Sequence, residues 1–184
     1  MGNLFVVSGP SGSGKSTLCA LAADMDKKIK ISVSATTRAP RGEEKNGVEY
    51  FFLSNEQFDE KLAEGDFYEY ANVFGNRYGT LKSHVDSLTA RGFDVILEID
   101  YQGAYQVRDK NKEAYLIFVM PPSYEELKKR LTDRHTESEE QLNIRLAKAS
   151  SEMEERVNYD KVIINDSLPD ALGELLSIIE SKRN

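Results

Sequence analysis

The chain lacks the residues that build disulfide frameworks, zinc fingers and membrane helices. Cys19 is the only cysteine in 184 residues, which excludes an intramolecular disulfide, and no Cys/His spacing suggests a zinc site. No stretch approaches the roughly 18 apolar residues of a membrane helix, and the N-terminus has no basic start of the kind that secretion signals carry. We therefore expect a cytoplasmic protein that has no contact with a membrane.

An excess of positive charge is also absent. The formal net charge is -7, so the surface lacks the broad positive field that attracts polymeric nucleic acid. An anionic ligand must then be held by a local site. The chain has no internal repeat, low-complexity segment or Pro/Gly/Ser linker, and its length suits one compact domain over residues 1–184 better than two. Amphipathic helix faces are compatible with a homo-oligomer as well as with a monomer.

Apolar runs that resemble buried strands alternate with helical patterns along much of the chain. The strand patterns occupy residues 4–8, 94–99, 115–120 and 162–164, and the helical patterns occupy residues 15–25, 102–108, 124–134 and 168–181. Pro169 suits the first turn of the last helix. Such alternation implies a parallel sheet with right-handed crossovers, whose ligand lies at the carboxyl ends of the strands. The predicted fold class is α/β, with a parallel sheet core flanked by helices.

Two segments interrupt this pattern. Between residues 31 and 78 the chain changes to short polar and aromatic runs with one helix near residues 55–63, which predicts an inserted mixed-β region. A dense polar turn at residues 133–140 separates two helical patterns and predicts a flap. We assign the core to residues 1–31, 81–125 and 148–184, the insert to 32–80 and a helical lid to 126–147.

A glycine-rich loop carries the strongest chemical signal. Residues 9–16 spell GPSGSGKS, which satisfies G-x-x-x-x-G-K-[ST] between a predicted strand and a predicted helix. Its glycines allow backbone N–H groups to converge on phosphate oxygens, Lys15 reaches the β and γ phosphates, and the Ser16 hydroxyl is a ligand for Mg²⁺. The alternative is a Gly/Ser-rich turn before a helix. The residues assigned to the nucleoside triphosphate here are Gly9, Pro10, Ser11, Gly12, Ser13, Gly14, Lys15, Ser16 and Thr17.

A phosphate-binding loop of this kind, a P-loop, also needs an acidic residue for its metal. The run VILEID supplies Glu98 and Asp100. Because they are two apart, both would face the same side of a strand. The sequence does not decide which of the two is nearer the metal, and acidic residues at a strand end also simply turn toward water.

The insert holds candidates for a second phosphate site. Arg38 and Arg41 lie in ATTRAPRGE, and Tyr50 and Tyr78 are nearby in sequence or pattern. Guanidinium forks combined with phenolic hydroxyls suit a phosphate dianion. Taken singly, each arginine is equally explained as a solvated surface charge.

Together these motifs resemble the guanylate kinase family. The segments SVSATTRAPRGEEKNGVEYFF, FYEYANVFGNRYGT and LEIDYQGA follow the P-loop in the family's order, and the resemblance covers nearly the whole chain. It implies a P-loop NTPase fold that transfers the γ-phosphoryl group of ATP to GMP and dGMP. It also implies that the insert holds the GMP phosphate through Arg38, Arg41, Tyr50 and Tyr78, that Ser34, Glu69 and Thr80 contact guanine, and that Asp100 lies between the nucleotides.

The resemblance extends to the lid. Arg130 and Arg134 are four apart and share a helix face, and Arg145 follows the flap. In this family such a lid brings arginines over the triphosphate, where negative charge must be balanced and water excluded. By the same resemblance Asn165 approaches the adenine ring, although a strand-end turn also explains it. The expected catalytic residues are Lys15, Arg38, Asp100, Arg134 and Arg145.

Chemistry supports the assignment of the base independently. Guanine offers adjacent N–H donors at N1 and N2, and one carboxylate such as Glu69 accepts from both. Adenine has an acceptor at N1 and would leave a buried Glu69 unpaired. Hydroxyls of Ser34 or Thr80 could donate to O6, which adenine also lacks. Without the resemblance, Glu69 would be interpreted as an exposed strand residue.

The chain departs from the usual family pattern at two positions. His135 stands where glycine often follows the lid arginine, and Tyr101 stands where tryptophan is usual. We expect Tyr101 to be nearly neutral and neither His135 nor His84, a predicted helix residue, to be catalytic. Two other functions compete with the kinase: a non-catalytic guanylate kinase-like module that binds protein partners, and a kinase for another small phosphate-bearing acceptor.

Overall fold

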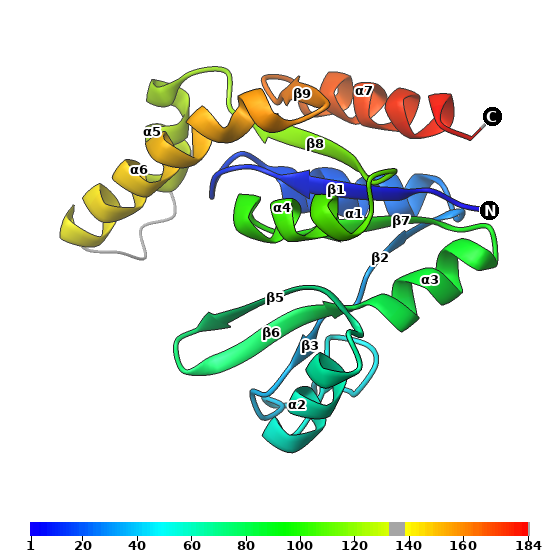
Figure 1. The fold of residues 1–184 in the computed structure, drawn as a ribbon. Helices are drawn as coiled ribbons and strands as arrows, with labels where there is room; N and C mark the ends of the chain where they lie inside the picture. The colour runs from blue at the N-terminus through cyan, green and yellow to red at the C-terminus, as the bar shows by residue number, and fades with distance from the viewer. Residues whose placement is uncertain (133–138, 184) are drawn as a thin grey trace.

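Five parallel strands form the central sheet of the described part of the chain, residues 1–132 and 139–183 of a computed structural model (Figure 1). Their order is β2-β7-β1-β8-β9. The strands are β1 (Leu4–Ser8), β2 (Ile29–Ile31), β7 (Asp94–Glu98), β8 (Tyr115–Met120) and β9 (Lys161–Ile164). The α/β class with a parallel sheet is confirmed, and so are β1 and β8 with their predicted ends. β2 was not predicted as a strand.

Helices cover both faces of this sheet, and β1 is therefore buried on both sides. Phe5 and Val7 face one apolar cluster, shared with α1 (Lys15–Met25) and α7 (Leu168–Ser181). Leu4 and Val6 face the other, shared with α3 (Lys82–Ala90) and α4 (Tyr101–Lys110). Strand side chains alternate between faces, so a continuous apolar run supplies both layers. α1 and α7 have the predicted ends, and α7 has Pro169 in its first turn. His84 lies in α3 as expected.

A second, mixed sheet lies beside the first one (Figure 1). Its order is β4-β3-β6-β5, with β3 (Ala35–Thr36), β4 (Phe51–Phe52), β5 (Phe67–Val73) and β6 (Asn76–Leu81). The strands pack on α2 (Asn55–Ala63) through a small core that contains Phe58 and Phe67. A capping box of Ser54 and Gln57 begins α2. The mixed-β region and its helix are therefore present as predicted.

Two further helices pack against each other near the carboxyl ends of the central strands. They are α5 (Tyr124–Thr132) and α6 (Glu139–Glu154), joined through Leu127, Leu131, Leu146 and Ala149. α6 runs unbroken through residue 148, where we drew the boundary between lid and core, and a 3₁₀ turn, η1 (Glu155–Asn158), follows it. The predicted flap at residues 133–140 lies largely outside the described residues, and Glu139 and Glu140 already belong to α6.

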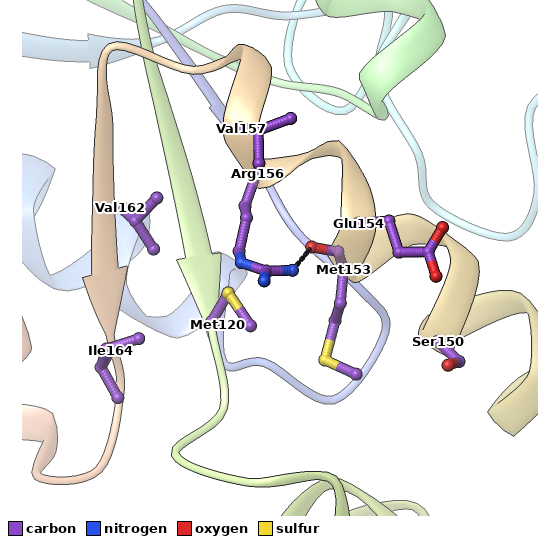
Figure 2. A pocket seen from close by; sticks show the side chains of 8 residues that line it. All are labelled: Met120, Ser150, Met153, Glu154, Arg156, Val157, Val162 and Ile164. Atoms are coloured by element: carbon purple, nitrogen blue, oxygen red, sulfur yellow. Dashed lines mark hydrogen bonds between the residues drawn. The ribbon is translucent and has the colours of Figure 1, made fainter.

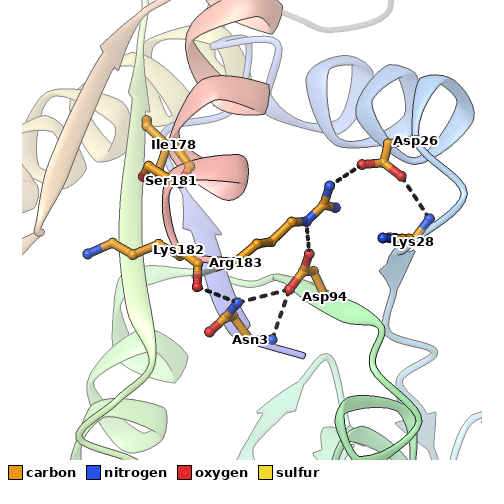
Figure 3. Close-up of polar contacts among 8 residues, drawn as sticks. All are labelled: Asn3, Asp26, Lys28, Asp94, Ile178, Ser181, Lys182 and Arg183. Carbon is orange, nitrogen blue, oxygen red and sulfur yellow. Dashed lines mark hydrogen bonds and ion pairs between the residues drawn. The ribbon is translucent and has the colours of Figure 1, made fainter. Parts of the chain in front are cut away.

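Polar contacts fasten the C-terminal end of α7 to the start of β7 (Figure 3). The buried Asp94 accepts from the Asn3 backbone N–H at 2.9 Å and from Arg183 Nε at 2.6 Å. Arg183 Nη1 also pairs with Asp26 at 2.6 Å. The network joins both chain ends to the edge opposite the P-loop. None of the helices in the described ranges has the length and apolar character needed to span a bilayer.

Candidate active site

The glycine-rich loop connects β1 to α1 at the carboxyl edge of the central sheet. Gly14 has φ 86°, and a Cβ there would lie 2.3 Å from Asn165 Nδ2. At Gly9 a Cβ would lie 2.2 Å from the Val119 carbonyl oxygen. The loop backbone therefore approaches the ends of β8 and β9 more closely than a side chain would allow. The loop has the strand-loop-helix setting that a phosphate cradle requires.

Asn165 and Arg130 support this loop from the side. Asn165 is buried, and its Nδ2 donates to the Ser13 carbonyl at 2.8 Å. Its backbone N–H donates to the Met120 carbonyl at 2.7 Å. Arg130 Nη2 donates to the Asn165 carbonyl at 3.0 Å, while its Nε bonds Glu126. In this structure both residues thus contact protein groups around the P-loop.

A cavity of about 340 Å³, which we call the P-loop cavity, opens beside the loop. Arg145 extends from α6 into its wall, and Arg145 Nη2 donates to Ser11 Oγ at 2.6 Å. One predicted cation, Lys15, and two predicted acids, Glu98 and Asp100, line the same space. The lining residues are Gly9, Ser11, Lys15, Glu98, Ile99, Asp100, Arg145, Lys148, Ala149 and Glu152.

Lys148 and Glu152 are members of this cavity that sequence reasoning missed. They lie three and seven positions after Arg145, which places them on the same face of α6. Lys148 Nζ lies 3.7 Å from Glu152 Oε1. Burial raises the pKa of Glu152, while Lys148 and Lys15 act in the opposite direction. The helical spacing from Arg145 was the available signal.

Glu98 and Asp100 reach the site from different structural elements. The Ser16 hydroxyl donates to Glu98 Oε1 at the end of β7. Asp100 lies beyond the strand and is the N-cap of α4, with Oδ1 accepting from the Gly103 N–H at 2.9 Å. Both line the P-loop cavity, although only Glu98 is a strand residue. No cluster of three or more His, Cys, Asp or Glu side chains with metal-binding geometry occurs among the described residues. Mg²⁺ needs only one or two protein oxygens when phosphates and water supply the rest, so this set fits it.

A second cavity of about 180 Å³, the insert cavity, lies between the two sheets. Ser34, Tyr50 and Thr80 come from the mixed sheet and the chain around it, and the end of β2 supplies the opposite wall. The lining residues are Ile31, Ser32, Ser34, Glu49, Tyr50, Thr80, Leu97, Glu98 and Ile99. Glu98 and Ile99 line both cavities. The end of β7 is therefore a wall shared by the two cavities.

Arg38, Tyr50 and Tyr78 gather at the insert. The Arg38 guanidinium carbon lies 5.2 Å from the centre of the Tyr50 ring, which lies 6.0 Å from the Tyr78 ring. Arg38 Nη2 pairs with Glu44 Oε1 at 3.0 Å, and this hydrogen bond holds the pKa of Glu44 below its usual range. Glu44 Oε2 also accepts from the backbone N–H of Arg41, whose side chain is exposed. The structure thus brings together Arg38, Tyr50 and Tyr78, three of the four predicted phosphate ligands. The side chain of the fourth, Arg41, is exposed.

Glu69 is a buried carboxylate on β5, only 7% exposed. The Thr80 hydroxyl donates to its Oε1 at 2.7 Å. Burial raises the pKa of Glu69, and the hydrogen bond from Thr80 opposes this effect only in part. A carboxylate with one hydroxyl donor has accepting capacity left over, which two adjacent N–H donors of a ligand would use.

Some predicted residues lie elsewhere. Arg134 and His135 fall outside the described residues. Tyr101 begins α4, and its ring meets Tyr105 edge-on with centroids 6.0 Å apart. His84 in α3 meets the Phe51 ring at 4.9 Å, and burial lowers its pKa. Tyr101 and His84 are both held by aromatic packing.

A third cavity of about 640 Å³ lies between α6, η1 and β9 (Figure 2). Met120, Met153, Val157, Val162 and Ile164 give it an apolar lining, and the Arg156 guanidinium turns back to the Met153 carbonyl. It contains none of the residues singled out from the sequence, and we assign it no chemistry.

The parallel sheet, the glycine-rich loop with its lysine and serine, and the adjoining anion-binding residues define a P-loop nucleotide-binding protein. A family model described as Guanylate kinase matches residues 1–182. Guanylate kinase of Fusobacterium nucleatum is 51% identical over 181 residues, covering 98% of this chain and 97% of that protein. Guanylate kinase of Neisseria gonorrhoeae is 48% identical over 182 residues, covering 99% and 89%. The crystal structure of guanylate kinase from Anaplasma phagocytophilum matches with a TM-score of 0.72 at 32% identity, covering 99% of this chain and 86% of that one. The chain belongs to the guanylate kinase family.

Gly14→Ala tests the close packing of the loop. The new Cβ would meet Asn165 Nδ2 in a left-handed backbone conformation, so we expect the free energy of unfolding to fall by roughly 1–3 kcal/mol. Gly173→Ala is the matched control, because Gly173 lies in α7 with open space around it, and it should gain roughly 0.5–1 kcal/mol. Urea denaturation measures both. A Gly14→Ala protein as stable as the wild type would contradict the described loop geometry.

Glu69→Gln tests the cost of burying a carboxylate. Because the pKa of Glu69 is higher in the folded chain than in the unfolded chain, its ionisation at neutral pH destabilises the folded state, and this cost disappears below the ordinary value of 4.5. We expect nucleotide-free Glu69→Gln to be more stable than the wild type near about pH 8, with a difference that shrinks toward about pH 4. Denaturant titrations at both pH values check this. Glu60→Gln, an exposed change on α2, is the control, and a Glu69→Gln protein that is less stable at the higher pH would refute the idea.

Proposed function

We propose that this protein transfers the γ-phosphoryl group of ATP to GMP, and likewise to dGMP, giving ADP and GDP or dGDP. The observation that carries this function is the pair of cavities that share Glu98 and Ile99. One cavity is lined by the P-loop lysine, and the other is lined by Thr80, whose hydroxyl donates to the buried carboxylate of Glu69. Two nucleotides bound in these cavities would meet at the end of β7. Family membership makes this reaction the expected one.

ATP is held by the loop residues 9–17. Backbone N–H groups of the loop and the N-terminus of α1 receive the phosphates, and Lys15 balances charge on the β and γ phosphates. Mg²⁺, when bound through Ser16 and Glu98 or Asp100, supplies further charge neutralisation at the phosphate oxygens. Asn165 and Arg130 lie beside the loop, where Asn165 donates to the Ser13 carbonyl and Arg130 to the Asn165 carbonyl. We place adenine on this side of the loop.

GMP is held by the insert. Arg38, Arg41, Tyr50 and Tyr78 receive its phosphate, with Arg38 aligned by Glu44 and stacked near Tyr50. Ser34 and Thr80 act as hydroxyl partners of the base, and Glu69 accepts from guanine N1–H and N2–H. A base without these donors would leave the buried carboxylate unpaired, which sets the specificity.

Phosphoryl transfer needs alignment and charge balance rather than a covalent nucleophile. We propose that residues 126–147 act as the lid and residues 32–80 as the acceptor region, and that both close on the core before transfer. Arg145 already contacts the P-loop through Ser11. Arg134 is proposed as a second lid cation from the sequence, and Asp100, the N-cap of α4, is proposed to lie between the two nucleotides.

Turnover across nucleotide acceptors tests this function. A coupled assay of ADP release should show activity with GMP and dGMP and far less with AMP, UMP and CMP. Lys15→Ala should lower turnover of GMP by at least about 10²-fold, because it removes a cation that balances transition-state charge. Lys27→Ala is the control, since Lys27 lies just beyond α1 and pairs with the exposed Asp24. Inert GMP with another active acceptor would overturn the proposed substrate, and full activity of Lys15→Ala would overturn the proposed site.

A further inference from the structure

β5, the strand that carries Glu69, pairs irregularly with β6 immediately before Glu69. In the pairing of β5 with β6, Phe67 faces Leu81 and Glu69 faces Thr80, so Tyr68 is an extra residue on β5. Phe67, Tyr68 and Glu69 are buried in succession instead of alternating. Phe67 packs in the core of the mixed sheet, and Tyr68 packs in the core of the central sheet. Such a bulge re-aims the side chains beside it, and here it directs Glu69 toward Thr80.

β5 is also an edge strand of its sheet, and its outer edge faces the core helix α4 (Figure 1). Gln106 on α4 replaces a neighbouring strand there. Gln106 Nε2 donates to the Tyr70 carbonyl at 3.1 Å, and Gln106 Oε1 accepts from the Tyr70 N–H at 3.1 Å. Both backbone groups of one residue after the bulge are satisfied by one side chain.

Lys110 makes the corresponding contact before the bulge. Lys110 Nζ donates to the Phe67 carbonyl at 2.8 Å. Gln106 and Lys110 are four apart, so they share a face of α4 and form hydrogen bonds to β5 on either side of Tyr68. Gly103 lies on the same face one turn earlier, and a Cβ there would come within 3.2 Å of Glu69 Oε2. The Glu69 carboxylate thus rests directly on α4.

We propose that Gln106 and Lys110 are positioning residues for guanine recognition, because they fix the bulge that aims Glu69 and hold it at a set distance from the start of α4. The inference rests on the proposed function. Asp100 caps α4, and the carboxylate of Glu69 on β5 packs against Gly103 of the same helix, so α4 connects the residue proposed between the nucleotides to the residue proposed to recognise the base. Loss of the hydrogen bonds made by either side chain would let β5 shift away from α4. A displacement of about 1 Å at a recognition group is enough to cost about 10²-fold.

Steady-state kinetics of two variants test the proposal. Gln106→Leu keeps the size of the side chain but removes both hydrogen bonds, and Lys110→Met removes one. Each should raise the KM for GMP by roughly tenfold, because Glu69 is displaced from guanine, and leave the KM for ATP within about twofold. The preference for GMP over IMP, which lacks the 2-amino group, should fall as well. Lys110→Arg should restore the KM for GMP, because it retains a donor.

Controls separate positioning from general stability and from the proposed function itself. Lys112→Met is matched to Lys110→Met, since Lys112 pairs with the exposed Asp109, and it should behave as the wild type. In a Glu69→Gln background Gln106→Leu should add little further loss, because both changes act on one recognition group. Hydrogen exchange at the Tyr70 amide should accelerate in Gln106→Leu while thermal unfolding changes little.

Three results would overturn the inference: an unchanged KM for GMP in both variants, parallel increases of the KM for GMP and ATP, or full additivity with Glu69→Gln. Each of them leaves the proposed function standing if the wild type turns over GMP. Failure of the wild type to use GMP would overturn both.

Discussion

The arrangement of the site depends on the carboxyl end of β7. Parallel strands end at one edge of a sheet, and this edge is where an α/β protein binds its ligand. β7 lies next to β1, so Glu98 meets Ser16 of the P-loop. β7 also continues into Asp100, which caps α4. The same few residues therefore form the wall of both cavities and the start of the helix that supports Glu69. The proposed geometry of phosphoryl transfer follows from that single strand end, with the lid and the insert closing on it from either side.

The proposed recognition of guanine through Glu69 requires a buried carboxylate, which lowers the stability of the nucleotide-free protein. Glu69 is buried, its only hydrogen-bond donor among the side-chain contacts of the described residues is Thr80, and its pKa is raised by that burial. An ionised carboxylate in such a place destabilises the nucleotide-free protein, and in the proposed function the two N–H donors of guanine remove this penalty. The bulge at Tyr68 and the contacts from α4 make this position available. The proposed recognition site is therefore less stable than a fully apolar core would be, as is common at functional sites.

Much of this could be predicted from the sequence, for physical reasons that differ between elements. Continuous apolar patterns or clear end signals mark β1, β8, α1, α2 and α7. The P-loop could be predicted because its motif residues have known roles in phosphate binding. β2 has only three residues, and α3 buries only Val85 and Thr89 and has no side-chain cap, so neither leaves a strong pattern. Asp100 was expected at the end of a strand, on the same side as Glu98, but it caps a helix. The bulge at Tyr68 and the contacts between Gln106 and β5 depend on tertiary packing between distant segments, which no local pattern encodes. The cytoplasmic location, the oligomeric state and the roles of individual site residues stay predictions.

The central claim is that a family P-loop kinase reads guanine through one buried carboxylate and binds ATP elsewhere. The most direct measurement is the KM for GMP and for ATP of Glu69→Gln beside the wild type. The amide of this variant presents an N–H group where guanine also has one, so the account predicts a rise of at least about tenfold in the KM for GMP, with the KM for ATP changed by less than about twofold. Equal changes in both constants would show that Glu69 does not read the base.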